Sequence, residues 1–335
     1  MILLQLTAVF FLSAGLIWAV RYFAPKIGLL DVPNERSTHC SIVPRGAGIG
    51  FSLAVFIVFA LFQPDLMMEY AWTSFAIVMV FMIGVLDDHH DTSPRTKFVV
   101  IILATIFLSF DGIKIDDLGD FFGVHLSLGW FAVPFTIFAV TGFTNALNLI
   151  DGLDGLSATM SIVILSVFMF VGIEYHDMFL ITLSSLLIVA LLAFLLFNWH
   201  PASIFMGDSG SLTLGFIISV LAIKSLAYIP TVSILFIAAV PILDTLVVMI
   251  RRKRNGRSFF SADRCHIHHI LRHFFAENTP RTVITLGVMQ LIYSLTGLQL
   301  DKQTDEGMLL VLFLLNVVLL YLFLDAMIKR QKREC

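Results

Sequence analysis

Apolar stretches of about 20 residues, separated by short polar segments, follow one another along almost the whole chain. A helical run of this length matches the hydrocarbon core of a bilayer. A spanning segment that is not part of a barrel must be helical, because lipid offers no partner for a free backbone N–H or C=O. The 335 residues are 58% hydrophobic and 13% charged, which excludes an ordinary soluble domain.

We therefore predict an all-α polytopic membrane protein, folded as a single integral membrane domain over residues 1–335. It should have about eleven transmembrane helices. The expected spans are 2–23, 46–62, 69–86, 98–110, 127–146, 157–173, 178–198, 211–227, 229–250, 282–298 and 307–328. Between the fourth and fifth spans, residues 111–126 alternate in polarity and contain turn residues, which is typical of a small hairpin.

Positive charge is distributed very unequally over the segments between these spans. Of the 21 Lys and Arg residues, all but Lys114, Lys224 and Lys302 follow an odd-numbered span. Because cytoplasmic loops collect Lys and Arg, we expect the N-terminus outside, the C-terminus in the cytoplasm and the chain in the cytoplasmic (inner) membrane. The lipid bilayer is an expected partner and nucleic acid is not, and a homodimer is left open.

Acids and histidines gather in polar islands that all follow odd-numbered spans. The islands are Asp87–Asp91, Asn145–Leu156, Met206–Ser211 and Asp263–His269. Carboxylates near lipid are costly and usually mark a site. We therefore expect cytoplasmic catalytic loops at about 24–45, 87–97, 147–156, 199–210 and 251–281. One-sided placement favours an enzyme at the membrane surface, since a transporter would need polar groups near the midplane; a membrane transporter is the distant alternative.

Asp208 lies in a Gly-Asp-Ser-Gly segment at the start of the eighth span. Taken alone it is equally well explained as a helix N-cap. Together with Asn148, Asp151 and Asp154 on the same face, it favours a Mg²⁺ site, because Mg²⁺ takes one or two carboxylates and binds substrate phosphates.

Three further polar features leave more than one interpretation open. Asp87 and Asp88 end the third span, where acids oppose the helix dipole, so metal, phosphate or proton handling is favoured over a solvated helix end. The segment His266–His269 is either a solvated basic loop, part of a zinc site with Cys265 and His273, or a binding segment for a diphosphate or nucleotide sugar, which we prefer. For Asp244, a purely structural pairing with a basic residue is as good an interpretation as a role in the site.

These islands, in this order, resemble the motifs of the polyprenyl-phosphate N-acetylhexosamine-1-phosphate transferases, which are multi-spanning membrane enzymes. The resemblance covers nearly the whole chain from Asp31 to His269. It is carried by the motifs Leu86-Asp87-Asp88, Asn145 to Leu156, Phe205 to Ser211, Pro241-Ile242-Leu243-Asp244 and His266 to His269. The segment Phe260–His269 is similar to the loop of the branch that uses UDP-N-acetylglucosamine (UDP-GlcNAc).

The resemblance implies transfer of GlcNAc-1-phosphate from UDP-GlcNAc to undecaprenyl phosphate. The products would be undecaprenyl-diphospho-GlcNAc and UMP, and the reaction would be the first membrane step of a cell-envelope polysaccharide such as an O-antigen. Residues Asn34–His39 and Pro44-Arg45-Gly46 also look like those of initiators that use rarer donors, such as UDP-N-acetylfucosamine.

The resemblance also implies roles for the residues of the islands. The nucleophile would be the lipid phosphate, which is already largely ionised near neutral pH because its second pKa is about 6; a covalent Asp intermediate is the older alternative. The metal would be Mg²⁺, for which Mn²⁺ could substitute. The expected metal ligands are Asp208 and Asn148, the catalytic residues Asp87, Asp88, Asp151 and Asp154, and the substrate-binding residues Asn145, Arg264, His266, His268 and His269.

Overall fold

The computed structural model describes residues 2–33, 42–258 and 266–330. Over these ranges the chain forms fourteen α-helices, so the predicted all-α class is confirmed. The helices are α1 (Ile2–Ile27), α2 (Ala47–Phe62), α3 (Pro64–Glu69), α4 (Ala71–His90), α5 (Pro94–Leu108), α6 (Ala132–Ile150), α7 (Leu156–Tyr175), α8 (Met178–Asn198), α9 (Asp208–Ser225), α10 (Ser233–Ile237), α11 (Ala239–Arg254), α12 (Ile267–Phe274), α13 (Thr279–Leu298) and α14 (Glu306–Arg330).

Two small antiparallel sheets accompany the helices. The predicted hairpin after the fourth span is confirmed as β3 (Asp117–Phe121) paired with β4 (Val124–Ser127). The second pair was not predicted. It joins β1 (Leu30–Asp31) to β2 (Val43–Pro44) within the first expected catalytic loop.

Seven of the described helical segments are long and apolar enough to cross a membrane. They are α1, α4, α6 with the short turn before it, α7, α8, α9 and α14. The chain is therefore a multi-pass membrane protein. All eleven expected spans coincide with helices, but the number of crossings stays a prediction, because α2 and α5 are shorter, the ninth span is divided and α13 is not among these seven segments.

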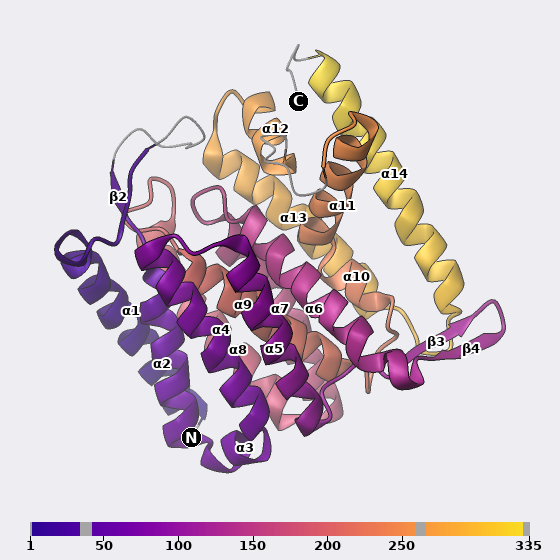
Figure 1. Ribbon diagram of the computed structural model, residues 1–335, viewed down its shortest axis with the longest axis horizontal. Helices are drawn as coiled ribbons and strands as arrows, with labels where there is room; N and C mark the ends of the chain where they lie inside the picture. The colour runs from indigo at the N-terminus through magenta and orange to yellow at the C-terminus, as the bar shows by residue number, and fades with distance from the viewer. Residues whose placement is uncertain (1, 34–41, 259–265, 331–335) are drawn as a thin grey trace.

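Helix α9 lies at the centre of the bundle and packs against α2, α4, α6, α7 and α8. In contrast, α14 lies at one edge, where many of its apolar side chains are exposed. The two chain ends lie at opposite ends of the molecule, with β2 and α12 near the C-terminal end and α3 and the β3–β4 hairpin at the other (Figure 1). An odd number of crossings requires this separation, whereas the side that faces the cytoplasm stays a prediction.

The prediction of one continuous helix over 229–250 is wrong. The helix breaks at Ala238 into α10 and α11. The cause is Pro241, because the ring of a proline within a helix clashes with the carbonyl four residues earlier, here that of Ile237. The buried side chain of Gln290 satisfies the interrupted backbone by accepting from Val240 N–H (2.9 Å) and donating to Ile237 C=O (2.7 Å).

Candidate active site

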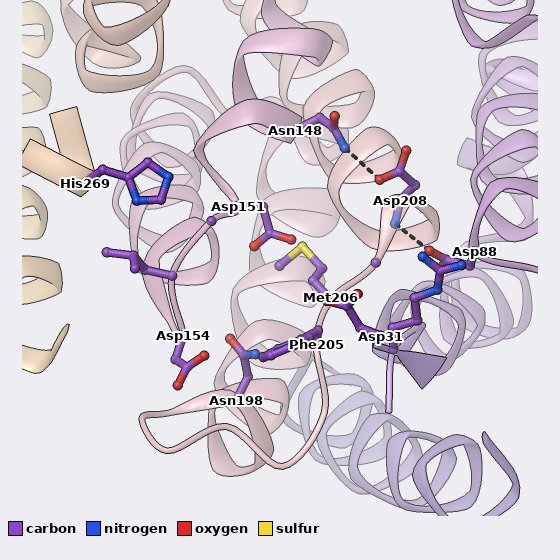
Figure 2. Close-up of a pocket in the computed structure, with 14 residues that line it drawn as sticks. Asp31, Asp88, Asn148, Asp151, Asp154, Asn198, Phe205, Met206, Asp208 and His269 are labelled. Carbon is purple, nitrogen blue, oxygen red and sulfur yellow. Dashed lines mark hydrogen bonds between the residues drawn. The ribbon is translucent and has the colours of Figure 1, made fainter. Parts of the chain in front are cut away.

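A pocket of about 340 Å³ opens at the end of the bundle that carries β2 and α12. Five carboxylates line it: Asp31, Asp88, Asp151, Asp154 and Asp208. They come from four segments that are far apart in the sequence, and Figure 2 shows them around one space together with Asn148 and His269. The structure thus gathers acids from three of the predicted islands into one site.

Several of these residues lie on helices where loops were predicted. Helix α4 continues to His90, so Asp88 lies on the last turn of α4. Helix α6 continues to Ile150, so Asn148 lies on the last turn of α6. The loop between α6 and α7 is consequently only residues 151–155. A helical backbone holds the two side chains more rigidly than a loop would.

The first turn of α9 places Asp208 in the pocket. Its N-cap is Gly207, whose φ of 74° is a conformation that favours glycine. Helix α4 approaches this turn so closely that a Cβ on Gly84 would lie 2.6 Å from the Asp208 carbonyl oxygen. The glycines therefore allow the backbone of neighbouring helices to fix the position of Asp208.

Lys97, at the start of α5, connects two acids of the site. Its Nζ lies 2.7 Å from Oδ2 of Asp208 and 3.2 Å from Oδ1 of Asp87. Asp87 also accepts a hydrogen bond from the Thr92 hydroxyl (2.6 Å). The lysine thus neutralises part of the negative charge that the cluster of acids creates.

Asn148 holds the other oxygen of Asp208. Its amide nitrogen donates to Asp208 Oδ1 (3.0 Å) and to the Ser211 hydroxyl (2.8 Å), as Figure 2 shows for the first of these bonds. Asn145, one helical turn earlier, is not among the residues that line the pocket. In this arrangement Asn148 orients Asp208 through its nitrogen.

Asp151 differs from the other acids because no side-chain hydrogen bond or ion pair joins it to any described residue. Burial raises its pKa to about 7, and the negative charges of Asp208, Asp88 and Asp154 contribute to the increase. A carboxylate in this situation is a good ligand for a cation, because a cation relieves both the burial and the repulsion.

Asp154 is fixed by the loop that precedes α9. Its Oδ2 lies 2.7 Å from Nδ1 of His200 and accepts from the backbone N–H of Ala202 (3.1 Å). Beside it, the buried side chain of Asn198 accepts from Gly155 N–H and donates to the carbonyl of Ile204, in the loop before α9. The loop that carries Asp151 and the loop that precedes Asp208 are therefore tied to one another.

The three predicted histidines have different environments. His266 is buried, and its Nδ1 lies 2.7 Å from Oδ2 of Asp244. Asp244 therefore has a basic partner, as its structural interpretation requires. His268 is also buried, and a Cβ on Gly152 would lie 2.6 Å from its Nε2. Burial lowers the pKa of His268 well below its usual value. Only His269 lines the pocket.

A magnesium ion fits this donor set. In the described ranges no three His, Cys, Asp or Glu side chains converge closely enough to form a metal site by themselves. Mg²⁺ does not need three, because it takes one or two carboxylates and completes its shell with water and substrate phosphates. Asp208 and the unpaired Asp151 line the same pocket and supply oxygen donors.

Some residues of the site were not predicted, and some predicted residues cannot be placed. Asp31, Arg45, Lys97, Asn198 and His200 were missed. Arg264 lies outside the described residues, and so does Cys265 of the zinc alternative. His273, the other residue of that alternative, has its Nδ1 3.1 Å from Oε1 of Glu277. Lys97 and His200 each fall in an expected catalytic loop, which was the available signal, whereas Asn198 ends α8.

The fold and the pocket define a multi-pass membrane protein with an acidic site at one end of its bundle. Residues 70–226 match glycosyl transferase family 4. A Bacillus subtilis (strain 168) protein, named a probable undecaprenyl-phosphate N-acetylglucosaminyl 1-phosphate transferase, is 34% identical over 89% of this chain and 84% of its own length. Undecaprenyl-phosphate alpha-N-acetylglucosaminyl 1-phosphate transferases of Yersinia pestis and Escherichia coli (strain K12) are 32% and 30% identical, over 94% and 93% of this chain and 89% and 88% of their own lengths.

The chain therefore belongs to glycosyl transferase family 4. The family resemblance found in the ordered motifs is confirmed by these comparisons.

Proposed function

We propose that this protein transfers GlcNAc-1-phosphate from UDP-GlcNAc to undecaprenyl phosphate in a Mg²⁺-dependent reaction on the cytoplasmic side of the membrane. The observation that carries the proposal is the pocket in which Asp88, Asp151, Asp154 and Asp208 meet at one end of the bundle. The names of the relatives support the choice of donor and acceptor. The excess of Lys and Arg in the loops at this end supports the cytoplasmic orientation.

The reaction is a phosphoryl transfer in which the protein positions substrates and neutralises charge. An oxygen of the lipid phosphate attacks the sugar-bearing β-phosphorus of the UDP-sugar. The bond from that phosphorus to the bridging oxygen breaks, and UMP leaves with the bond's electron pair. Because the lipid phosphate is a competent nucleophile when ionised, we favour this direct attack over a covalent Asp intermediate.

Each group at the site has a role in this scheme. Asp208 and Asp151 would hold Mg²⁺, which supplies positive charge for the diphosphate when it is bound. Asn148 keeps Asp208 oriented, and Lys97 adds positive charge beside the same carboxylate. Asp87, next to Lys97, can accept the proton that remains on a protonated lipid phosphate.

His269 is the histidine that lines the pocket, and we assign it to the diphosphate or sugar of the donor. His266 and His268 are buried and support the helix that carries it. A donor with a 6-deoxy sugar, such as UDP-N-acetylfucosamine, is the alternative substrate for the same reaction. The residues that suggest it, Asn34–His39, lie outside the described ranges.

The test uses purified protein in detergent with undecaprenyl phosphate, Mg²⁺ and a panel of UDP-sugars. UMP release and the mass of the lipid product are measured, with and without EDTA. UMP formed only from UDP-GlcNAc and stopped by EDTA supports the proposal in full. UMP formed only from a 6-deoxy donor changes the substrate, and no UMP from any donor with folded protein contradicts the activity and favours the transporter.

A further inference from the structure

The first turn of α9 lacks a cap from its own sequence. A helix begins with backbone N–H groups that have no partner within the helix, and the residue before the helix usually supplies a side-chain oxygen. In α9 that residue is Gly207, which has no side chain. The acceptor comes from α4: Asp88 Oδ1 accepts from Asp208 N–H (2.8 Å), and Oδ2 accepts from Ser209 N–H (3.1 Å).

Both oxygens of Asp88 are used in this way and are enclosed. The residue is only 2% exposed. Gly207 covers the carboxylate, because a Cβ at that position would lie 2.5 Å from Oδ1 and 2.6 Å from Oδ2. Figure 2 shows Asp88 directed at the backbone of Asp208. A substrate or cation would have to displace that backbone to reach both oxygens.

The same arrangement occurs at the opposite end of the molecule. Glu306, at the start of α14, accepts from Thr231 N–H (2.7 Å) and Val232 N–H (2.9 Å), just before α10. Glu306 lies against β3, because a Cβ on Gly119 would lie 2.6 Å from its Cγ, and the β3–β4 hairpin is at the end of the molecule opposite β2 and α12 (Figure 1). A buried carboxylate that receives two consecutive backbone N–H groups is therefore a structural feature that this chain also uses away from the pocket.

We infer that Asp88 is a positioning residue, which holds the backbone of Asp208 in place and neither accepts a proton from the substrate nor binds the cation. The inference rests on the proposed function for its activity measurement. It separates the roles of the adjacent acids: Asp87 pairs with Lys97, which also contacts the Asp208 carboxylate, whereas Asp88 acts through the backbone at the start of α9.

The test compares Asp88→Asn with Asp88→Ala. Asn keeps one side-chain oxygen as acceptor and Ala keeps none, while both remove the negative charge. We expect a graded loss. Asp88→Asn should retain about a tenth to a hundredth of wild-type kcat, as for a small displacement of a catalytic group. Asp88→Ala should be at least tenfold lower, and the acidic limb of the pH–rate profile of Asp88→Asn should stay in place.

Thermal midpoints and Mn²⁺ binding give a second measurement that needs no turnover. The midpoints should fall in the order wild type, Asp88→Asn, Asp88→Ala. The matched control is Glu306→Gln, which removes the charge of the other carboxylate that accepts two backbone N–H groups. Electron paramagnetic resonance with MnCl₂ alone should show binding to Asp88→Asn weakened by no more than about tenfold and binding to Asp208→Asn lost. These readings hold even if no donor sugar is turned over, so failure of the proposed function remains distinguishable.

One pattern would overturn the inference: Asp88→Asn and Asp88→Ala equally inactive, with wild-type thermal midpoints. Loss of Mn²⁺ binding in Asp88→Asn as complete as in Asp208→Asn would do the same. If Asp88→Ala does not fold, the pH–rate profile and Mn²⁺ binding of Asp88→Asn decide alone.

Discussion

Replacing Lys97 with Met should destabilise the protein and make its stability depend on Mg²⁺. Lys97 Nζ lies 2.7 Å from Asp208 and 3.2 Å from Asp87, and its side chain is 22% exposed. Met has a similar length and fills the same space without charge. The substitution therefore leaves two mostly buried carboxylates facing one another without the cation that now separates them.

The size of the effect follows from this geometry. Removing one partner of a buried ion pair costs about 3–5 kcal/mol. All three side chains are partly exposed, so we expect a cost at the lower limit, about 3 kcal/mol. For a chain of 335 residues the unfolding entropy then predicts a fall in thermal midpoint of about 4 °C. Differential scanning fluorimetry in detergent at pH 8, without divalent cations, measures it.

Mg²⁺ should reverse part of this loss, because it supplies positive charge to the same carboxylates. The rise in midpoint on adding Mg²⁺ should therefore be larger for Lys97→Met than for wild type. Lys329→Met is the control, since Lys329 forms an exposed pair with Asp325, worth only a few tenths of a kcal/mol. If both variants have the same midpoint and the same response to Mg²⁺, the ion-pair reasoning is wrong.

Three other predictions concern the same site. Asp208→Asn should lower turnover by about a hundredfold or more at any Mg²⁺ concentration, and the protein should stay folded because Lys97 keeps Asp87 as a partner; near-normal UMP release would refute its role as a metal ligand. Asp151, whose pKa is raised to about 7, binds a proton below that pH, and Mg²⁺ must displace this proton. The midpoint rise caused by Mg²⁺ should therefore grow between about pH 6 and pH 8, and an unchanged rise would contradict the assignment. Gly84→Ala should lower the midpoint and the yield of folded protein, because its Cβ would lie 2.6 Å from the backbone of α9. Gly15→Ala, with nothing within 4 Å, should not, and equal behaviour of the two would show that α4 has room to move.

The helices were predictable from the sequence because a bilayer leaves the backbone few alternatives. Hydrophobic length located all of the expected spans on helices, but it could not locate the break at Ala238. Pro241 was visible in the sequence, and its effect depends on a partner for the freed backbone groups. That partner is Gln290, which lies 50 residues further along the chain and packs there only in the folded bundle.

Four of the five acids that line the pocket were found from the sequence, but their individual roles were not. At the C-terminal end of α4 taken alone, Asp88 opposes the helix dipole. In the folded bundle its carboxylate stabilises the N-terminal end of a different helix, α9. In the sequence, Lys97 contributes only to the charge bias that sets the topology, because nothing there shows that it reaches Asp208, 111 residues away.

The sequence by itself determined the membrane class, the order of the spans and the set of polar islands at one end. These depend on hydrophobic length and on the cost of a charge in lipid, which act on each segment separately. Only the tertiary structure decided which acid caps a helix, which is paired and which has no partner. Hydrogen bonds and ion pairs act over about 3 Å, and distances of that size between α4, α5, α6 and α9 are set by how the helices pack.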